Sequence, residues 1–194
     1  MQKLLLIAAL GMLAGCAGAD GVASAGGSPS RCGGDVNTLA SAPGKAWLVE
    51  HRWRFKTDAD AAAAYAGLAK GASPWPDWFS PPDAVLQPGT RFQMALGVGQ
   101  PTGTPGSFGT FDQIRRVRDV RDSLAVRQEW KPKIDRVATY EVVKPINVKI
   151  GPVGPQVDGQ LCRILPGRGS QFQMLVPRGT AMDFLTLIEV RPIR

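Results

Sequence analysis

The chain has 194 residues, of which 44% are hydrophobic and 20% charged, and its formal net charge at pH 7 is +7. These values exclude a collagen-like chain, a coiled coil and a multi-span membrane protein, and they fit one domain with at most a tail. One His and three Cys, with no C-x-x-C or H-x-x-x-H spacing, are too few for a standard zinc site, so we expect no metal.

The N-terminus has the pattern of a lipoprotein signal peptide over residues 1–15. Lys3 precedes an apolar run over residues 4–13 that is too short to be an ordinary membrane anchor, and residues 13–16 read Leu-Ala-Gly-Cys, like a bacterial lipobox. We predict that Cys16 is acylated and that several acyl chains anchor the protein stably. A plain signal peptide with an incidental Cys is the alternative. Because Ala rather than Asp follows Cys16, we expect a lipid-anchored protein of the bacterial cell envelope, at the outer membrane and facing the periplasm.

Residues 16–45 are rich in Ala, Gly, Ser and Pro, which predicts a flexible tether and leaves residues 46–194 as one globular domain. Export places Cys32 and Cys162 in an oxidising compartment, and this favours a disulfide between them. The alternative is two buried or free thiols.

The first predicted elements are a strand and a helix. Residues 47–55 alternate between apolar and polar side chains, which predicts a strand with one buried face. His51 lies on the apolar side, where an interior histidine is a commoner role than a catalytic base. Thr57 and Asp58 then begin an Ala-rich helix that runs to Lys70.

The rest of the chain predicts mostly strands. Residues 91–96 form a strand, the Gly-rich loop over 97–109 is long enough to be functional or mobile, and a helix with an apolar stripe covers 112–127. Further strands are predicted over residues 137–144, 146–150, 160–165, 170–176 and 184–191. Two helices and about seven strands indicate an α+β domain with a mixed, mainly antiparallel sheet.

Two separated strands resemble each other. Residues 91–96 and 171–176 both contain Phe-Gln-Met, and alternate side chains in each strand are apolar. The polar side chains of the two strands lie on the opposite face and are Arg91, Gln93, Gln171 and Gln173. If the strands are neighbours, these side chains form one polar floor over which the loop at 97–109 can close. A guanidinium beside carboxamides suits a phosphate and an amide, both of which NAD carries. The alternative is two half-solvated strands with ordinary polar faces.

The C-terminal part carries a series of short motifs, which are Pro88-Gly89-Thr90, Gly106–Asp112, Tyr140–Pro145, Gly151–Gln156 and Pro166–Phe172. On these motifs, residues 86–194 resemble the C-terminal domains of bacterial polymorphic toxins, of the NAD glycohydrolase (tuberculosis necrotizing toxin-like) and ADP-ribosyltransferase-like type. The resemblance implies an ADP-ribosyltransferase-like fold and NAD as the substrate. It also matches Gln171 to the family Gln that supports cleavage of the nicotinamide–ribose bond. A family Arg falls near Met94 here, and Arg91 lies three residues earlier.

In this interpretation Gln171 and Arg91 are the catalytic residues, and Gln171 orients the ribose or the attacking water. The other expected NAD-binding residues are Gln93, Phe108, Phe111, Arg115, Arg116 and Gln173. The phenylalanines would stack on nicotinamide or pin its ribose, and the arginines would hold the pyrophosphate. Attack by water gives a glycohydrolase, whereas attack by a protein side chain gives a transferase; positioning alone can accelerate either reaction.

The alternative function is that of a non-catalytic envelope lipoprotein. Such a protein would bind a protein or cell-wall partner through the loop at 97–109 and through the aromatic, Pro-rich segment that contains Trp75 and Trp78. The moderate positive charge permits an anionic ligand or an acidic partner in either case, and we expect no nucleic acid.

Overall fold

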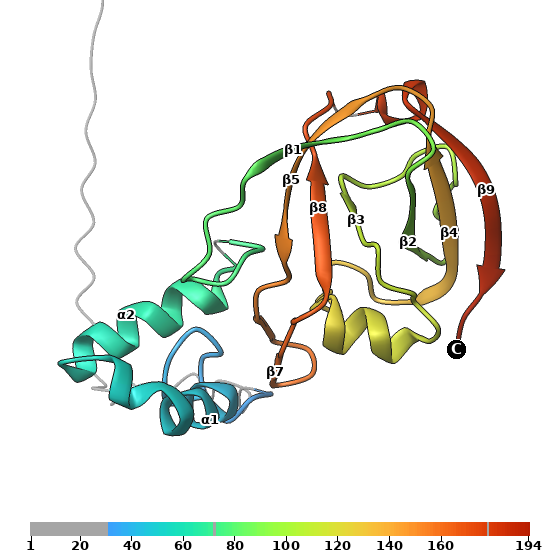
Figure 1. The fold of residues 1–194 in the computed structure, drawn as a ribbon. Helices are drawn as coiled ribbons and strands as arrows, with labels where there is room; N and C mark the ends of the chain where they lie inside the picture. Colours follow the sequence, from blue (N-terminus) through green and yellow to red (C-terminus); the bar gives the residue numbers. More distant parts are fainter. Residues whose placement is uncertain (1–30, 72, 178) are drawn as a thin grey trace, which may run out of the picture.

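The computed structural model describes residues 31–71, 73–177 and 179–194, and their strands form two main sheets and a small one (Figure 1). The first sheet has the order β1 (Asp83–Leu86), β5 (Ile146–Pro152), β8 (Ser170–Met174) and β3 (Phe108–Gly109). The second has the order β2 (Arg91–Gly97), β4 (Ile134–Val142) and β9 (Leu185–Pro192), and the small sheet pairs β6 (Gln156–Asp158) with β7 (Arg163–Leu165). Each of these strand pairs is antiparallel.

The two main sheets are joined at Thr110, directly after β3. The Gln93 N–H donates to the Thr110 carbonyl over 2.8 Å, and the Thr110 N–H donates to the Gln93 carbonyl over 3.0 Å. Strands β8, β3, β2, β4 and β9 therefore follow one another around a curved wall, as Figure 1 shows. The two look-alike strands, β2 and β8, are not neighbours, because β3 lies between them, so the condition for a shared polar floor is not met.

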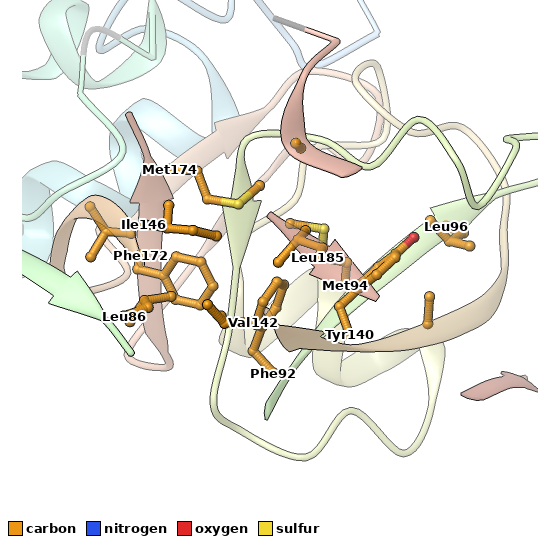
Figure 2. Close-up of a cluster of buried hydrophobic side chains, with 13 residues drawn as sticks. Leu86, Phe92, Met94, Leu96, Tyr140, Val142, Ile146, Phe172, Met174 and Leu185 are labelled. Carbon is orange, nitrogen blue, oxygen red and sulfur yellow. The ribbon is translucent and has the colours of Figure 1, made fainter. Parts of the chain in front are cut away.

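The main core lies inside this curved wall (Figure 2). Alternation along β2 directs Phe92, Met94 and Leu96 inward, and the Phe92 ring meets the Phe172 ring of β8 edge-on at 4.9 Å. A side chain at Gly109 would overlap the Phe172 ring, so β3 fits between its neighbours only with glycine at this position. The fully buried aromatic and aliphatic side chains each contribute roughly 1.5–3 kcal/mol through burial.

The expected α+β class with antiparallel strands is confirmed, but the described residues contain nine strands rather than about seven. Strands occur close to the expected places at 91–96, 137–144, 146–150, 170–176 and 184–191, and β7 covers only the end of 160–165. Strands β1, β3 and β6 were not expected. They span two to four residues, which is too short for an alternating pattern to stand out.

The expected strand at 47–55 is wrong, because this segment is helical. Helix α1 (Ala42–His51) begins at Ser41, whose hydroxyl accepts from the Gly44 N–H over 3.1 Å, and the short 3₁₀ helix η1 (Arg52–Arg54) follows. The expected tether is also wrong for residues 31–45, since Cys32 is buried and turns lead directly into α1. The expectation for residues 16–30 lies outside the described residues, as do the signal peptide and the acylation of Cys16.

Helix α2 (Asp58–Ala69) confirms the expected helix, with Lys70 as its last, capping residue. Thr57 and Asp60 form a reciprocal capping box at its start, and this satisfies two backbone N–H groups. The helix buries Tyr65 against α1, and burial raises the pKa of the Tyr65 hydroxyl, which donates to the Val36 carbonyl over 2.9 Å. Helices α1 and α2 thus form a second packed unit beside the sheets (Figure 1).

The expected helix at 112–127 is largely wrong. A single π-helical turn, η2 (Asp119–Ser123), replaces it, and one further short helix, η3 (Ala181–Asp183), precedes β9. The segment ends early because Ala125 adopts a left-handed φ of 48° and the carbonyls of Asp122 and Ser123 accept N–H groups from the loop at 167–169. The apolar stripe that suggested the helix is nevertheless packed inward.

The expected disulfide between Cys32 and Cys162 is present, with 5.1 Å between the two Cα atoms. It links the chain ahead of α1 to the turn before β7. Within the described residues, we find no helix with the length and apolar character that crossing a bilayer requires.

Candidate functional site

A cavity of about 440 Å³ lies where the two main sheets join. Strand β2 contributes Gln93 to Ala95, β3 and the loop before it contribute Gly106 to Thr110, and β8 contributes Gln171. The remaining lining residues come from Gly71, Pro74, Leu124 to Val126, Trp130, Lys131, Val153 and Gln156. Its size and its mainly apolar lining with a few polar groups are typical of a small-molecule site.

Three glutamines line this cavity, and each is fixed by one hydrogen bond to the backbone. The Ile114 N–H donates to Gln93 Oε1 over 2.8 Å, Gln171 Nε2 donates to the Pro74 carbonyl over 2.6 Å, and Gln156 Nε2 donates to the Ser73 carbonyl over 2.8 Å. Among the residues that the structure describes, the second polar atom of each of these side chains has no hydrogen-bond partner. The cavity thus contains carboxamides whose positions are set by the fold.

The charged group of the cavity is Lys131. Its ammonium donates to Gln100 Oε1 over 2.6 Å, and within the part of the chain that the structure describes no carboxylate lies within 4 Å of it. Burial lowers the pKa of Lys131 below its ordinary value. A half-buried cation whose partner is a neutral amide can accept an anionic ligand group.

The Gly-rich loop forms one wall of the cavity, and its first half is anchored. Gln100 Oε1 accepts from the Gly97 N–H, the Arg136 guanidinium donates to the carbonyls of Gly97 and Gln100, and the Tyr140 hydroxyl donates to the Thr102 carbonyl over 2.7 Å. Burial raises the pKa of Tyr140, so this donor stays protonated in neutral solution. Only the second half, through Gly106 and Ser107, reaches the cavity.

The structure brings together three of the expected site residues, Gln93, Phe108 and Gln171. Arg91 does not reach them: it lies at the exposed start of β2, and its Nε donates to Glu141 on β4 over 2.7 Å. Gln173 is half-buried between β3 and β5 outside the cavity lining, and the Phe111 ring packs on Phe172 at 5.1 Å. The single polar floor that we expected from four side chains is therefore wrong.

Sequence reasoning missed Lys131, Trp130 and Gln156 in this cavity. Gln156 ends one of the short motifs, Gly151–Gln156, which was the one available signal. Lys131 and Trp130 carry no pattern of their own and reach the cavity through the turn after η2.

Arg115 and Arg116 line a separate cleft of about 660 Å³ beside η2 and the loop at 166–169. Asp119 pairs with one of the two guanidinium groups: its carboxylate lies 3.2 Å from Arg116 Nε and also accepts the backbone N–H groups of both arginines, whereas Arg115 Nε donates to Gln113 Oε1. Burial alone would raise the pKa of Asp119, but these hydrogen bonds outweigh it and hold the pKa below its ordinary value.

Asp122 gives this cleft a testable pH dependence. Burial would raise its pKa, but hydrogen bonds from Arg118 Nε and Arg163 Nη2, at 2.9 and 2.8 Å, outweigh it and lower the pKa in the folded state. The stabilisation is therefore complete above the unfolded pKa of about 3.9 and is lost as the pH falls through the folded pKa. Asp122→Asn should lower the Tm by a few degrees at pH 7, and the difference should vanish in strong acid.

Thermal unfolding of both proteins between pH 2 and 7 measures this effect. Asp77→Asn is a matched control, because Asp77 makes one exposed ion pair with Arg54 and should change the Tm little at any pH. A difference between Asp122→Asn and the parent that stays constant with pH would contradict the assignment.

A third hollow, of about 800 Å³, lies between α1, the aromatic loop and β7. Trp78 lines it and is 73% exposed, whereas Trp75 is buried in the core. His51 lies at its edge at the end of α1, stacked on Trp47 at 4.9 Å, with Nδ1 3.0 Å from the Trp47 carbonyl. This contact makes Nδ1 the donor and places His51 as a helix-terminal residue rather than an interior one.

Three solved structures are similar to this chain. Tne2 in complex with Tni2 matches with a TM-score of 0.50 and 20% identity over 61% of this chain and 97% of the matched chain. Rhs1-CT in complex with its cognate immunity protein RhsI1 matches with a TM-score of 0.42 and 17% identity, over 59% of this chain and 81% of the matched chain. Tse6 in complex with Tsi6 matches with a TM-score of 0.37 and 13% identity, over 75% of this chain and 93% of the matched chain. No protein-family model and no curated protein matches the chain. The similarity to Tne2 shows a shared fold.

Proposed function

We propose that this chain is a toxin-like domain that binds NAD in the 440 Å³ cavity and hydrolyses its nicotinamide–ribose bond. The observation that carries the proposal is that Gln93 and Gln171, from two look-alike strands 78 residues apart in the sequence, line one cavity together with Phe108. The motif resemblance, the match of Gln171 to the family Gln and the fold shared with Tne2 support it. We further propose that the fold is ADP-ribosyltransferase-like.

The cavity offers groups that suit the nicotinamide riboside end of NAD. The rings of Phe108 and Trp130 provide flat apolar surface for the pyridine ring, and Lys131 provides a cation for the nearer phosphate. Arg91, Arg115 and Arg116 lie outside the cavity, so Lys131 takes the phosphate-binding role that we expected of them. The adenosine end would remain outside, towards the open side of the cavity.

The proposed reaction is a displacement at the ribose. The bond between C1′ and the nicotinamide nitrogen breaks with its electron pair, and nicotinamide leaves as a neutral molecule. A water oxygen bonds to C1′ and loses its proton to solvent, which gives ADP-ribose. Positive charge develops on the ribose in the transition state, and the Gln171 carboxamide oxygen would stabilise this charge or orient the water. We propose water rather than a side chain as the nucleophile.

Incubation of the full-length, oxidised protein with NAD tests the proposal directly. We expect stoichiometric release of nicotinamide and ADP-ribose, measured by chromatography, and a rise in Tm when NAD is added under conditions of slow turnover. Release of neither product, together with an unchanged Tm at millimolar NAD, would reject NAD as the ligand.

Lys131→Met should separate binding from stability. Loss of the cation should weaken NAD binding by roughly tenfold to a hundredfold. Because the folded state lowers the pKa of Lys131, the unfolded state binds this proton more tightly, and the charged side chain costs stability below the unfolded pKa of about 10.4. The variant should therefore have a higher Tm at pH 7, and this gain should disappear near pH 10–11.

Titration calorimetry and thermal unfolding measure the two effects, with Lys133→Met as the control, because Lys133 is exposed and outside the cavity lining. If Lys131→Met binds NAD as tightly as the parent, Lys131 does not hold the phosphate.

We also propose that the protein is exported and anchored in the bacterial outer membrane, facing the periplasm, through acylated Cys16. The disulfide between Cys32 and Cys162 supports export, since such bonds persist in oxidising compartments. A protein partner is a second part of the proposal, because Tne2 was solved in complex with Tni2. The alternative function is the non-catalytic binding of a protein or cell-wall partner. For this function, the exposed Trp78 beside the 800 Å³ hollow would provide the contact surface.

A further inference from the structure

The three most exposed large hydrophobic side chains of the described residues come from neighbouring elements. Val49, Trp53 and Trp78 are 85%, 82% and 73% exposed, and they belong to α1, to η1 and to the aromatic loop after α2. Single exposed hydrophobic residues are common in proteins, but a contiguous group of them marks an interaction surface.

Val49 and Trp53 continue an apolar stripe on the outer side of α1. The exposed residues Ala42, Ala46 and Val49 follow one another at spacings of four and three residues, which places them on one side of the helix. Trp53 follows Val49 after four more residues, in η1. The opposite side of α1 carries the buried Trp47, which packs on α2. Helix α1 is therefore apolar on both sides, and the described residues cover only the inner one.

Trp78 belongs to the same surface as this stripe. Arg54 Nη2 lies 2.6 Å from Asp77 Oδ2, so an ion pair joins the residue after Trp53 to the residue before Trp78. In addition, Ala46 and Trp78 line the same 800 Å³ hollow. We refer to this surface as the apolar patch, which consists of Ala42, Ala46, Val49, Trp53 and Trp78.

The described part of the chain begins beside the apolar patch. The Ala42 N–H donates to the Cys32 carbonyl over 2.9 Å, so the chain ahead of Cys32 joins the domain at the first residue of the patch. Cys16 lies 15 positions before Arg31, and a fully extended chain of that length spans about 50 Å. Figure 1 shows α1 on the side of the domain away from β9. An anchor at Cys16 would therefore keep the patch, rather than the side with β9, near the bilayer.

The chemistry of the patch suits the boundary between lipid headgroups and acyl chains. Trp53 Nε1 donates to the Glu50 carbonyl over 2.8 Å, so transfer of this ring into lipid would leave no indole donor unpaired. Lys45 and Lys56 are exposed on either side of the stripe in the sequence, and among the described residues neither has a carboxylate within 4 Å. Aromatic rings flanked by lysines are typical of surfaces that lie in this boundary, where the ammonium groups meet lipid phosphates.

We propose that the apolar patch docks on the surface of the lipid bilayer, with Trp53 and Trp78 inserted at the level of the headgroups. This inference rests on the proposed anchoring through acylated Cys16 and goes beyond it, because an acyl anchor alone does not orient the domain. It is independent of NAD cleavage. Docking would give the anchored domain one fixed orientation relative to the bilayer.

Quenching of tryptophan fluorescence by brominated lipids tests the contact directly. The full-length, oxidised protein is reconstituted into vesicles of phosphatidylcholine and phosphatidylglycerol whose acyl chains carry bromine, which quenches indoles that reach it. We expect the emission of the parent to fall, and the Trp53→Phe/Trp78→Phe double variant to lose most of this quenching. Trp130→Phe is the matched control, because Trp130 is 54% exposed outside the patch and should leave the quenching unchanged. Thermal unfolding checks that the three proteins are equally folded.

The outcomes separate docking from anchoring. Flotation of the vesicles shows whether the protein is bound, and mass spectrometry of the N-terminal peptide shows whether Cys16 is acylated. If the protein floats but the double variant is quenched as much as the parent, docking is overturned and anchoring stands. If Cys16 carries no acyl chain but the quenching depends on Trp53 and Trp78, anchoring fails and docking stands. A protein that does not float overturns docking, and so does a blue-shifted emission without quenching, which would show that a second copy or another protein covers the patch.

Discussion

Gln171→Ala should lower the rate of nicotinamide release from NAD by about two to three orders of magnitude. Gln171 is only 7% exposed, and its Nε2 donates to the Pro74 carbonyl over 2.6 Å, so its carboxamide oxygen is held in one place in the cavity before any ligand enters. Groups fixed in advance stabilise a transition state without reorganisation, and alanine removes the group completely. The rate is measured at saturating NAD by chromatography of free nicotinamide.

Two controls distinguish a lost catalytic group from a disturbed fold. Gln173→Ala changes the same residue type on the same strand outside the cavity lining, and its rate should stay within about twofold of the parent's. Loss of the bond to Pro74 should cost Gln171→Ala only about 1 kcal/mol of unfolding free energy, which thermal unfolding measures. A Gln171→Ala protein that turns over NAD at the parental rate would exclude Gln171 from catalysis.

Removing the disulfide should produce the largest loss of stability in this chain. The bond joins residues 130 positions apart, and the entropy of closing so long a loop in the unfolded chain corresponds to about 3–5 kcal/mol. We expect the Cys32→Ala/Cys162→Ala double variant to lose that much unfolding free energy and roughly 10 °C in Tm. Thermal unfolding of the parent in strong reductant should give the same lowered Tm.

Single variants sharpen this experiment. Cys32→Ala and Cys162→Ala each leave one free thiol, and both should match the double variant, because the loss comes from the missing cross-link rather than from either side chain. An oxidised parent and a double variant with equal Tm values would show that packing of α1 and α2 alone fixes this end of the domain.

The sequence predicts the long strands well because their burial is one-sided. Alternate positions of β2 are buried from Phe92 to Leu96, so the period of two in the sequence reports the structure directly. The same period misleads at 47–55, where Val49 and Trp53 are exposed on helical backbone. In this segment the capping residue Ser41 and Pro43 begin a helix. The helix packs against α2, and the alternation within residues 47–55 carries no information about that contact.

The candidate site was predictable only in part. Gln93 and Gln171 could be paired because the two strands repeat the same three residues, and alternation assigned both to the polar face. Arg91 shares that face but lies opposite Glu141, a partner on β4 that no motif in β2 indicates. Lys131 follows a turn and Gln156 begins β6, and the position of both depends on how the small sheet packs under η2, which is a property of the whole fold.

The junction at Thr110 has a consequence for how a ligand would affect the domain. Two backbone hydrogen bonds to Gln93 connect a short strand to its larger neighbour there, and the cavity borders this junction on both sides. A molecule bound in the cavity would contact β2 and β8 at once, and its contacts would add to the two hydrogen bonds that join the sheets there. Ligand binding would therefore raise the free energy of local opening most at Phe108–Thr110, and the two main sheets would then open together rather than separately.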